Sequence, residues 1–191
     1  MTTIKADVTL DAKGLACPMP IVKTKKAMKD LETGQVLEVA ATDKGSKADI
    51  QAWAESTGQQ YIGTIEEGEV LKHYLRKSSG EDGAEHRFAN AVNNAFLTEK
   101  LQEGKPVVVL DVRESAEHQF NHIPGAVSIP LGELDTRLGE LDKGSEIYVI
   151  CRTGTRSDLA CQKLAANGFE QVYNVLPGMS GWTGETKGFN S

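Results

Sequence analysis

The feature that most constrains the fold of this chain is a short apolar run that stops at a cysteine. The run Ile147–Ile150 is rich in β-branched residues, which is typical of a strand buried inside a parallel sheet. From residue 159 the apolar spacing becomes helical, and Gly168 stands where a glycine often follows the last turn of a helix. The sequence therefore predicts a strand, a tight turn and a helix, with Cys151 at the turn.

Cys151 is expected at the carboxyl end of that strand, with the N–H groups of the turn behind it. Amides gathered at the positive end of a helix dipole stabilise an anion. Arg152 and Arg156 add two cations beside the thiol, and such cations favour the thiolate and attract dianions. A cysteine that only packed under the turn would need no charges around it. We therefore predict that Cys151 is a nucleophile.

The spacing between Cys151 and Arg156 separates two kinds of cysteine chemistry. The phosphate-binding loop of cysteine phosphatases is one residue longer than the present loop, in which residues 152–155 lie between the cysteine and the arginine. A low-molecular-weight phosphatase or an arsenate reductase is therefore the disfavoured alternative. No proline occurs among residues 152–156, so several N–H groups can point into the loop. We predict from this that Cys151 is the more acidic thiol when compared with Cys17.

Four stretches of the second half resemble the rhodanese (sulfurtransferase) family, over about residues 88–187. They are the strand and Asp-Val-Arg at 107–113, the His-Ile-Pro-Gly-Ala at 122–126, the segment 175–182 with its Gly and Trp, and the loop Cys151-Arg152-Thr153-Gly154-Thr155-Arg156. The resemblance implies a parallel sheet flanked by helices on both faces. It also implies that Cys151 attacks a sulfane sulfur and holds it as a persulfide. The loop residues that would bind the donor and stabilise the persulfide are Arg152, Thr153, Gly154, Thr155 and Arg156.

Residues near this loop are assigned supporting or structural roles. Asp111 ends a predicted strand, and Arg113 is expected to pair with a carboxylate and brace the loop. His122 is expected to brace a turn, because a thiolate nucleophile needs no general base. Cys161 lies too far along the helix to form a disulfide with Cys151, and we expect it to pack in the core.

The remaining elements of the second half follow from apolar spacing. Residues 88–104 are expected to be mostly helical. Strands are predicted at residues 107–110, 127–129, 147–150 and 172–176, separated by helical or irregular segments. This alternation is typical of a parallel sheet covered on both faces.

The first half has the pattern of a small α/β unit, which we expect to be a two-layer sandwich. The predicted order is βαβαββ, with strands at residues 4–10, 36–41, 61–65 and 70–76 and helices at residues 18–31 and 46–57. The second helix opens with Ser46 and Asp49 in a capping-box-like spacing and ends at Gly58. His73 is expected to be an exposed strand residue.

Cys17 opens the first of these helices in an unusual setting, Cys17-Pro18-Met19-Pro20. This order places Cys17 at the N-cap and the prolines at N1 and N3, where a missing N–H is tolerated. Together with Asp11, Gly14, the lysines after the motif and the Thr42-Asp43 pair, the segment resembles the TusA-like (SirA-type) sulfur-carrier family over residues 7–77. The resemblance implies that Cys17 accepts sulfur as a persulfide and passes it on.

The chain is expected to hold two domains, a TusA-like sulfur-carrier domain at residues 1–77 and a rhodanese-like domain at residues 88–191. Residues 78–87 are small and polar, which is typical of a linker. The net charge of −6 argues against direct nucleic-acid binding, and no apolar run is long enough for a membrane span or a signal peptide. The sparse cysteines Cys17, Cys151 and Cys161 have no metal-binding spacing and suit the reducing cytoplasm.

Two sulfur-handling cysteines in one chain predict a relay. We expect Cys151 to load from a small donor such as thiosulfate or a low-molecular-weight persulfide and to exchange sulfur with Cys17, which then serves a downstream acceptor protein. The direction between the two cysteines is left open by the residues. No metal and no cofactor beyond the covalent persulfide is expected. The alternative from another class is a sulfide- or redox-sensing binding module that does not turn over.

Overall fold

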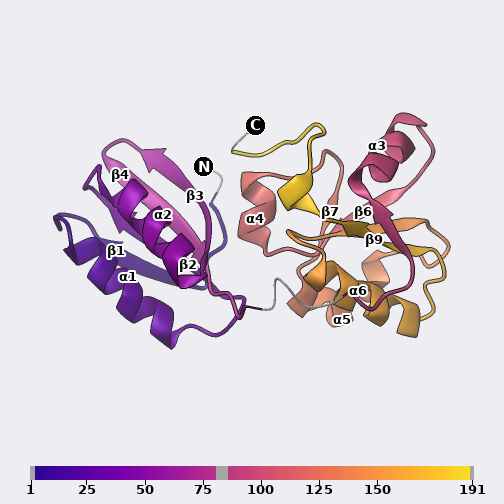
Figure 1. Cartoon of the computed structure of the whole chain (residues 1–191), viewed down its shortest axis with the longest axis horizontal. Helices are drawn as coiled ribbons and strands as arrows, with labels where there is room; N and C mark the ends of the chain where they lie inside the picture. Colours follow the sequence, from indigo (N-terminus) through magenta and orange to yellow (C-terminus); the bar gives the residue numbers. More distant parts are fainter. Residues whose placement is uncertain (1–2, 81–85, 190–191) are drawn as a thin grey trace. The chain divides into compact units, whose positions relative to one another are not determined.

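The computed structural model describes residues 3–80 and 86–189, and the chain divides after Gly80 into two compact units (Figure 1). Each unit has its own sheet and its own core, so each is described by itself.

The first unit is a four-stranded sheet with two helices packed on it (Figure 1). Its elements are β1 (Val8–Ala12), α1 (Met19–Asp30), β2 (Val36–Ala41), α2 (Ser46–Thr57), β3 (Gln60–Glu67) and β4 (Val70–Arg76). The strand order is β1-β2-β4-β3, with β1 parallel to β2 and β4 antiparallel to both of its neighbours. Met28 of α1 and Ile50 of α2 pack on Leu37 and Leu75 of the sheet. The predicted βαβαββ sandwich is confirmed.

The predicted starts of β1 and α2 are wrong. The first strand begins at Val8 rather than residue 4, because the ladder with β2 starts there. The capping box is absent: Gly45 is the N-cap of α2, and Ser46 is already helical. The Ser46 hydroxyl instead donates to the Asp43 carbonyl oxygen at 2.6 Å. The C-terminal signal is confirmed, since Gly58 has φ +72° and its N–H closes the helix.

The second unit is a five-stranded parallel sheet in the order β5-β9-β8-β6-β7. Its strands are β5 (Ala91–Asn93), β6 (Val108–Asp111), β7 (Val127–Ser128), β8 (Ile147–Ile150) and β9 (Val172–Leu176). Its helices are α3 (Asn94–Gln102), α4 (Ser115–Phe120), α5 (Leu134–Arg137) and α6 (Thr155–Ala166), and short 3₁₀ turns lie at Leu131–Glu133, Leu138–Glu140 and Met179–Gly181.

Strand β8 shows why both faces of this sheet are covered. Its side chains alternate between two cores. Ile147 and Val149 pack with Leu164 of α6, whereas Tyr148 and Ile150 pack with Leu97 of α3. Helices therefore cover both faces, as predicted (Figure 1).

The expected helix at residues 88–104 is wrong in its first part. Residues 91–93 add an edge strand to β9, and the helix begins only at Asn94. The side chain of Asn93 explains the boundary, because its Oδ1 accepts a hydrogen bond from the Phe96 N–H at 2.8 Å.

Candidate functional site

Cys151 follows β8 directly, and α6 begins at Thr155, so the predicted strand, turn and helix are confirmed. The turn is completed by Gly154 with φ +99°, a conformation that favours glycine. In this conformation the Gly154 N–H donates to Cys151 Sγ at 3.1 Å. The amide thus places a positive dipole on the sulfur at the N-terminal end of a 12-residue helix.

The Cys151 side chain is only 1% exposed, yet its surroundings are not purely apolar. Ser157 Oγ lies 3.3 Å from Sγ, on the first turn of α6. The Ser157 hydroxyl donates to Asn174 Oδ1 at 2.6 Å, and Asn174 Nδ2 donates to the Gly154 carbonyl oxygen at 3.2 Å. The Cys151 thiol therefore lies in a small polar network between the loop, α6 and β9.

The segment after β9 holds the loop from the other side. The Met179 N–H donates to the Cys151 carbonyl oxygen at 2.8 Å, and the Ser180 N–H donates to that of Arg152 at 2.9 Å. Gly178, with φ +86°, allows this close approach, because a Cβ there would lie 2.4 Å from the Cys151 carbonyl oxygen. The spacing of apolar residues does not predict these two hydrogen bonds. The only sequence feature that indicates them is Gly178, which follows β9.

Arg156 points to a carboxylate. Its guanidinium donates to both oxygens of Glu117 on α4, at 2.7 and 2.9 Å, and both side chains are buried. Burial alone would lower the pKa of Arg156, but the Glu117 charge and hydrogen bonds raise it above its ordinary value, with a further contribution from Cys151. The Arg156 charge is thus fixed beside the loop. Its predicted contact with a sulfur donor remains a prediction.

The other predicted loop residues line the same turn. Arg152, Thr153 and Thr155 are half-buried, and Gly154 is buried against Leu176 and His86. Within residues 3–80 and 86–189, the buried Thr155 Oγ1 has no hydrogen-bond partner. A hydroxyl in this position can donate a hydrogen bond to an atom bound at the loop.

Asp111 and Arg113 form a buried ion pair at 2.7 Å, so the predicted pairing of Arg113 with a carboxylate is confirmed. Burial alone would raise the pKa of Asp111, but the Arg113 charge and the hydrogen bonds from His118 and Arg113 lower it. Arg113 also donates to the Asn121 carbonyl oxygen at 2.6 Å. His118 follows Glu117 on α4 and Asn121 is the C-cap of that helix, so this network fixes the helix that carries the partner of Arg156.

His122 lies beside the same network. Its Nδ1 donates to the His118 carbonyl oxygen at 2.7 Å, and the two imidazole rings stack with centroids 4.0 Å apart. This contact bears out its predicted role in bracing a turn. Cys161 of α6 is fully buried in the core, where burial and the Asp158 charge raise the pKa of its thiol. Its predicted packing role is also borne out.

Cys17 is exposed, in contrast to Cys151. The prediction that it caps α1 is wrong: the helix begins at Met19, its N-cap is Pro18, and the Cys17–Pro18 peptide bond is cis. The Met19 N–H is taken by the Ala16 carbonyl oxygen, so that amide does not serve the thiol. The pKa of the Cys17 thiol is raised, first by the Asp49 carboxylate of α2 as a hydrogen-bond acceptor, then by burial and by the charges of Asp49 and Asp43.

The expectation that His73 is exposed is also wrong, since its side chain is fully buried in β4. Ser46 Oγ lies 2.9 Å from its Nε2, and Thr64 Oγ1 lies 2.7 Å from its Nδ1. Ser46 gives its hydrogen to the Asp43 carbonyl oxygen, so it accepts from Nε2–H and His73 is the Nε2–H tautomer. Burial, aided by the Lys47 charge, lowers the pKa of His73 to about 4. A sequence pattern gives no signal for this network.

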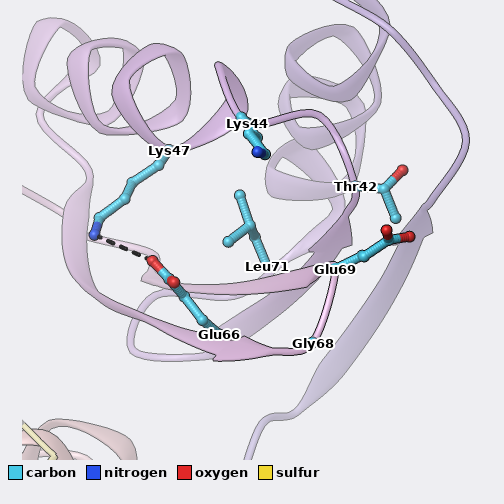
Figure 2. A pocket seen from close by; sticks show the side chains of 7 residues that line it. All are labelled: Thr42, Lys44, Lys47, Glu66, Gly68, Glu69 and Leu71. Atoms are coloured by element: carbon cyan, nitrogen blue, oxygen red, sulfur yellow. Dashed lines mark ion pairs between the residues drawn. The ribbon is translucent and has the colours of Figure 1, made fainter.

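A pocket of about 660 Å³ lies where the segment after β2 meets the β3–β4 hairpin (Figure 2). Figure 2 shows Leu71 pointing into it from the sheet, with Lys47 and Glu66 paired across one side. Thr42 lines it and also accepts the Gly14 N–H at 2.9 Å, which ties the pocket wall to the loop before Cys17. Its remaining lining residues are Lys44, Gly68 and Glu69.

No group of histidine, cysteine and acidic side chains with metal-binding geometry occurs in the described residues. Likewise, none of the helices in residues 3–80 and 86–189 is long and apolar enough to cross a membrane.

Comparison with known proteins assigns each unit to a family. Residues 8–77 match the family described as Sulfurtransferase TusA, and residues 94–185 match the Rhodanese-like domain. A solution structure of a rhodanese-like domain from Anabaena matches the fold with a TM-score of 0.50 at 29% identity. The match covers 54% of this chain and 82% of that domain.

Relatives extend the match to the whole chain. YrkF of Bacillus subtilis (strain 168), whose name designates a candidate sulfur carrier protein, is 52% identical over 189 residues, or 96% of this chain and 100% of that protein. YtwF of the same strain, named as a candidate sulfurtransferase, is 41% identical over 96 residues, or 50% of this chain and 92% of that protein. The chain therefore belongs to the family of sulfur-carrier and sulfurtransferase proteins in which a TusA domain is fused to a rhodanese-like domain.

Proposed function

We propose that this protein moves sulfane sulfur through two cysteine persulfides, one on Cys151 and one on Cys17. The observation that carries the proposal is the hydrogen bond from the Gly154 N–H to Cys151 Sγ, at the positive end of α6. This amide and the nearby charge of Arg156 place a positive dipole and a cation beside the sulfur, and a cysteine that only packs in a core needs neither. The chemistry needs no bound cofactor, because the sulfur is carried covalently.

Loading from thiosulfate balances without a further reagent. The Cys151 thiolate attacks the outer sulfur, a bond forms between Sγ and that sulfur, and the original S–S bond breaks. Sulfite leaves with the electron pair of that bond, and the charge remains on the new persulfide. The buried Thr155 Oγ1, which has no hydrogen-bond partner in the described residues, supports a role for Thr155 as a hydrogen-bond donor to the bound group. A low-molecular-weight persulfide can load Cys151 in the same way, with a thiolate as the leaving group.

Cys17 exchanges this sulfur with Cys151 in the second step. Its exposure suits a carrier that must meet other thiols, including that of a downstream acceptor protein, whereas the buried Cys151 suits a small donor. We place loading at Cys151 first for this reason. All three cysteines are free, which accords with a reducing compartment such as the cytoplasm.

Single-cysteine variants and labelled donor test the relay. Cys151→Ser, Cys17→Ser and the parent protein are each incubated with thiosulfate labelled at its outer sulfur, and the label on each cysteine is measured by peptide mapping. The relay predicts label on Cys17 only when Cys151 is present, and restoration when the two variants are mixed. Equal labelling of Cys17 without Cys151 would remove the relay.

The burial of Cys151 favours a second candidate, a sulfide or redox sensor that binds a partner and does not turn over. Steady-state turnover separates the two functions. A sulfurtransferase releases sulfite continuously from thiosulfate when a thiol or cyanide acceptor is present, whereas a sensor releases at most one equivalent per site.

A further inference from the structure

We propose that the pocket beside the β3–β4 hairpin binds a small thiol that carries both an ammonium and a carboxylate group, and that this thiol accepts sulfur from Cys17. This inference rests on the proposed carrier role of Cys17 and names the chemical class of an acceptor for it. The pocket volume of about 660 Å³ lies within the usual range of small-molecule sites, about 300–1,000 Å³.

The charged side chains of the pocket are separated by sign (Figure 2). Lys44 and Lys47 come from the segment after β2 and from the first turn of α2. Glu66 and Glu69 come from β3 and from the turn that follows it. A simple anion in this pocket would meet the two glutamates, and a simple cation would meet the two lysines. A ligand with one charge of each sign can face both sides favourably.

These charges are available to a ligand. Within residues 3–80 and 86–189, Lys44 and Glu69 form no ion pair. Lys47 Nζ and Glu66 Oε1 lie 4.0 Å apart, which is beyond hydrogen-bonding distance, and both side chains are more than half exposed. The lysines can therefore donate hydrogen bonds to a carboxylate, and the glutamates can accept hydrogen bonds from an ammonium group.

Leu71 gives the pocket an apolar floor between the two pairs of charges. Figure 2 shows its side chain pointing from β4 into the space between them. The carbon atoms that separate the ammonium and carboxylate groups of an amino-acid headgroup can pack on this side chain. The lining thus fits a small thiol with such a headgroup better than it fits an inorganic ion.

The pocket lies at the end of the sheet where the loop to Cys17 begins. Helix α1 starts at this end, because it must run back along the sheet to reach β2, which is parallel to β1. The Gly14 N–H donates to Thr42 Oγ1 of the pocket wall at 2.9 Å, which holds this loop beside the pocket. One row of paired residues crosses the sheet at the same end, in strand order: Ala12, Ala41, Leu71 and Glu66.

The transfer step balances in atoms and electrons. The acceptor thiolate, R–S⁻, attacks the outer sulfur of the Cys17 persulfide, a bond forms between the two sulfurs, and the bond from the outer sulfur to Cys17 Sγ breaks. Cys17 Sγ leaves with the electron pair of that bond and takes a proton from water. The acceptor gave its own proton to water when it ionised. The products are R–S–SH and the Cys17 thiol, with no external oxidant or reductant.

Calorimetry tests the binding site apart from sulfur transfer. The protein carries Cys17→Ser and Cys151→Ser, so that neither residue can form a persulfide or a disulfide, and reduced glutathione is the probe. Lys44→Gln and Glu69→Gln are each expected to bind glutathione at least about fivefold more weakly, because each loses one charged contact in a partly exposed site. 3-Mercaptopropionate and cysteamine, which carry only one of the two charges, should also bind at least about fivefold more weakly.

Lys29→Gln and Glu32→Gln are the matched controls, since both residues are exposed in the same unit and lie outside the pocket lining. They should bind glutathione as the parent does. Absence of glutathione binding, or equal losses in the control variants, would overturn the site. If 3-mercaptopropionate or cysteamine binds as tightly as glutathione, the ligand does not need both charges and the assignment of its class is wrong.

Transfer is measured on Cys151→Ser protein that is loaded at Cys17 with sodium tetrasulfide and then freed of excess reagent. Intact mass follows the loss of sulfur to glutathione, or to 2-mercaptoethanol, which has neither charge. Lys44→Gln is expected to slow the transfer to subsaturating glutathione at least about threefold and to leave the transfer to 2-mercaptoethanol unchanged. If Lys44→Gln slows both transfers equally, or neither, the pocket does not serve the acceptor although Cys17 is still a carrier. A Cys17 that takes up no sulfur overturns the carrier role and the acceptor assignment, whereas the calorimetry still decides whether the binding site exists.

Discussion

The amide nitrogen of Gly154 lies 3.1 Å from Cys151 Sγ, and only a glycine can hold it there. The φ of +99° costs a residue with a side chain about 1–3 kcal/mol. A Cβ would also lie 2.3 Å from Leu176 Cδ2 and 3.0 Å from His86 Cε1, so the loop would have to move. The position of this glycine therefore determines whether an N–H reaches the sulfur.

We predict that Gly154→Ala lowers the rate of persulfide formation on the order of 100-fold, comparable to the loss of one amide donor from an anion site. Gly104→Ala is the matched control, because Gly104 also has positive φ, +66°, but open space where the Cβ would lie. It is expected to cost about 1 kcal/mol in stability and to leave the rate unchanged. Equal rates in Gly154→Ala and the parent would contradict the role of this amide.

The Arg156–Glu117 ion pair predicts a large stability effect in the second unit. Arg156→Gln leaves the Glu117 carboxylate buried without its charge partner, which is expected to cost about 3–5 kcal/mol. Arg137→Gln is the control: Arg137 pairs with Glu133 and Glu140 in a partly exposed position, where water screens the charges, so its loss is expected to cost far less stability than the loss of Arg156.

Urea unfolding in a Trp53→Phe background measures this difference, because Trp182 then reports the second unit alone. If the two arginine variants lose similar free energies of unfolding, the buried Arg156–Glu117 pair does not support the loop.

The buried His73 predicts a pH dependence of stability in the first unit. Its pKa is lowered from 6.5 to about 4, so the unfolded chain takes up a proton below pH 6.5 while the folded chain does not until about pH 4. Stability is therefore lost as the pH falls through this window, by about 3 kcal/mol in total, and is fully present above it.

His73→Gln isolates this contribution. In a Trp182→Phe background, Trp53 reports unfolding of the first unit. The stability of the parent minus that of the variant is expected to fall between pH 6.5 and 4 and to be constant from pH 7 to 8. A constant difference over the acidic window would mean that His73 accepts a proton in the folded unit as readily as in water.

Much of the fold was predictable because its signals are local. Strands β2, β4, β8 and β9 have the predicted bounds, since apolar runs and flanking turn residues define them. Strand β5 was not predictable, because its three residues, two of them exposed, carry little apolar signal and form a strand only by pairing with β9.

The surroundings of the two cysteines were harder to predict from the sequence. The loop around Cys151 is local, but its support comes from Glu117 and Asn174, which are 39 and 17 residues away from their partners on α6. The pKa of Cys17 is raised by Asp49, a residue that the sequence predicts only as part of a helix cap. The sequence predicted His73 to be exposed, because its partners Ser46 and Thr64 belong to other elements and give no local signal. Such contacts arise only when the sheet assembles.

The central claim is that Cys151 carries a sulfane sulfur, and the mass of the intact protein after incubation with thiosulfate tests it most directly. The account predicts a gain of one sulfur atom in the Cys17→Ser variant, lost again on reduction and assigned to Cys151 by peptide mapping. Cys161→Ser is the control, since that thiol is fully buried in the core, and it should gain sulfur as the parent does. A Cys17→Ser protein that stays at its unmodified mass, or gains sulfur elsewhere, would contradict the claim.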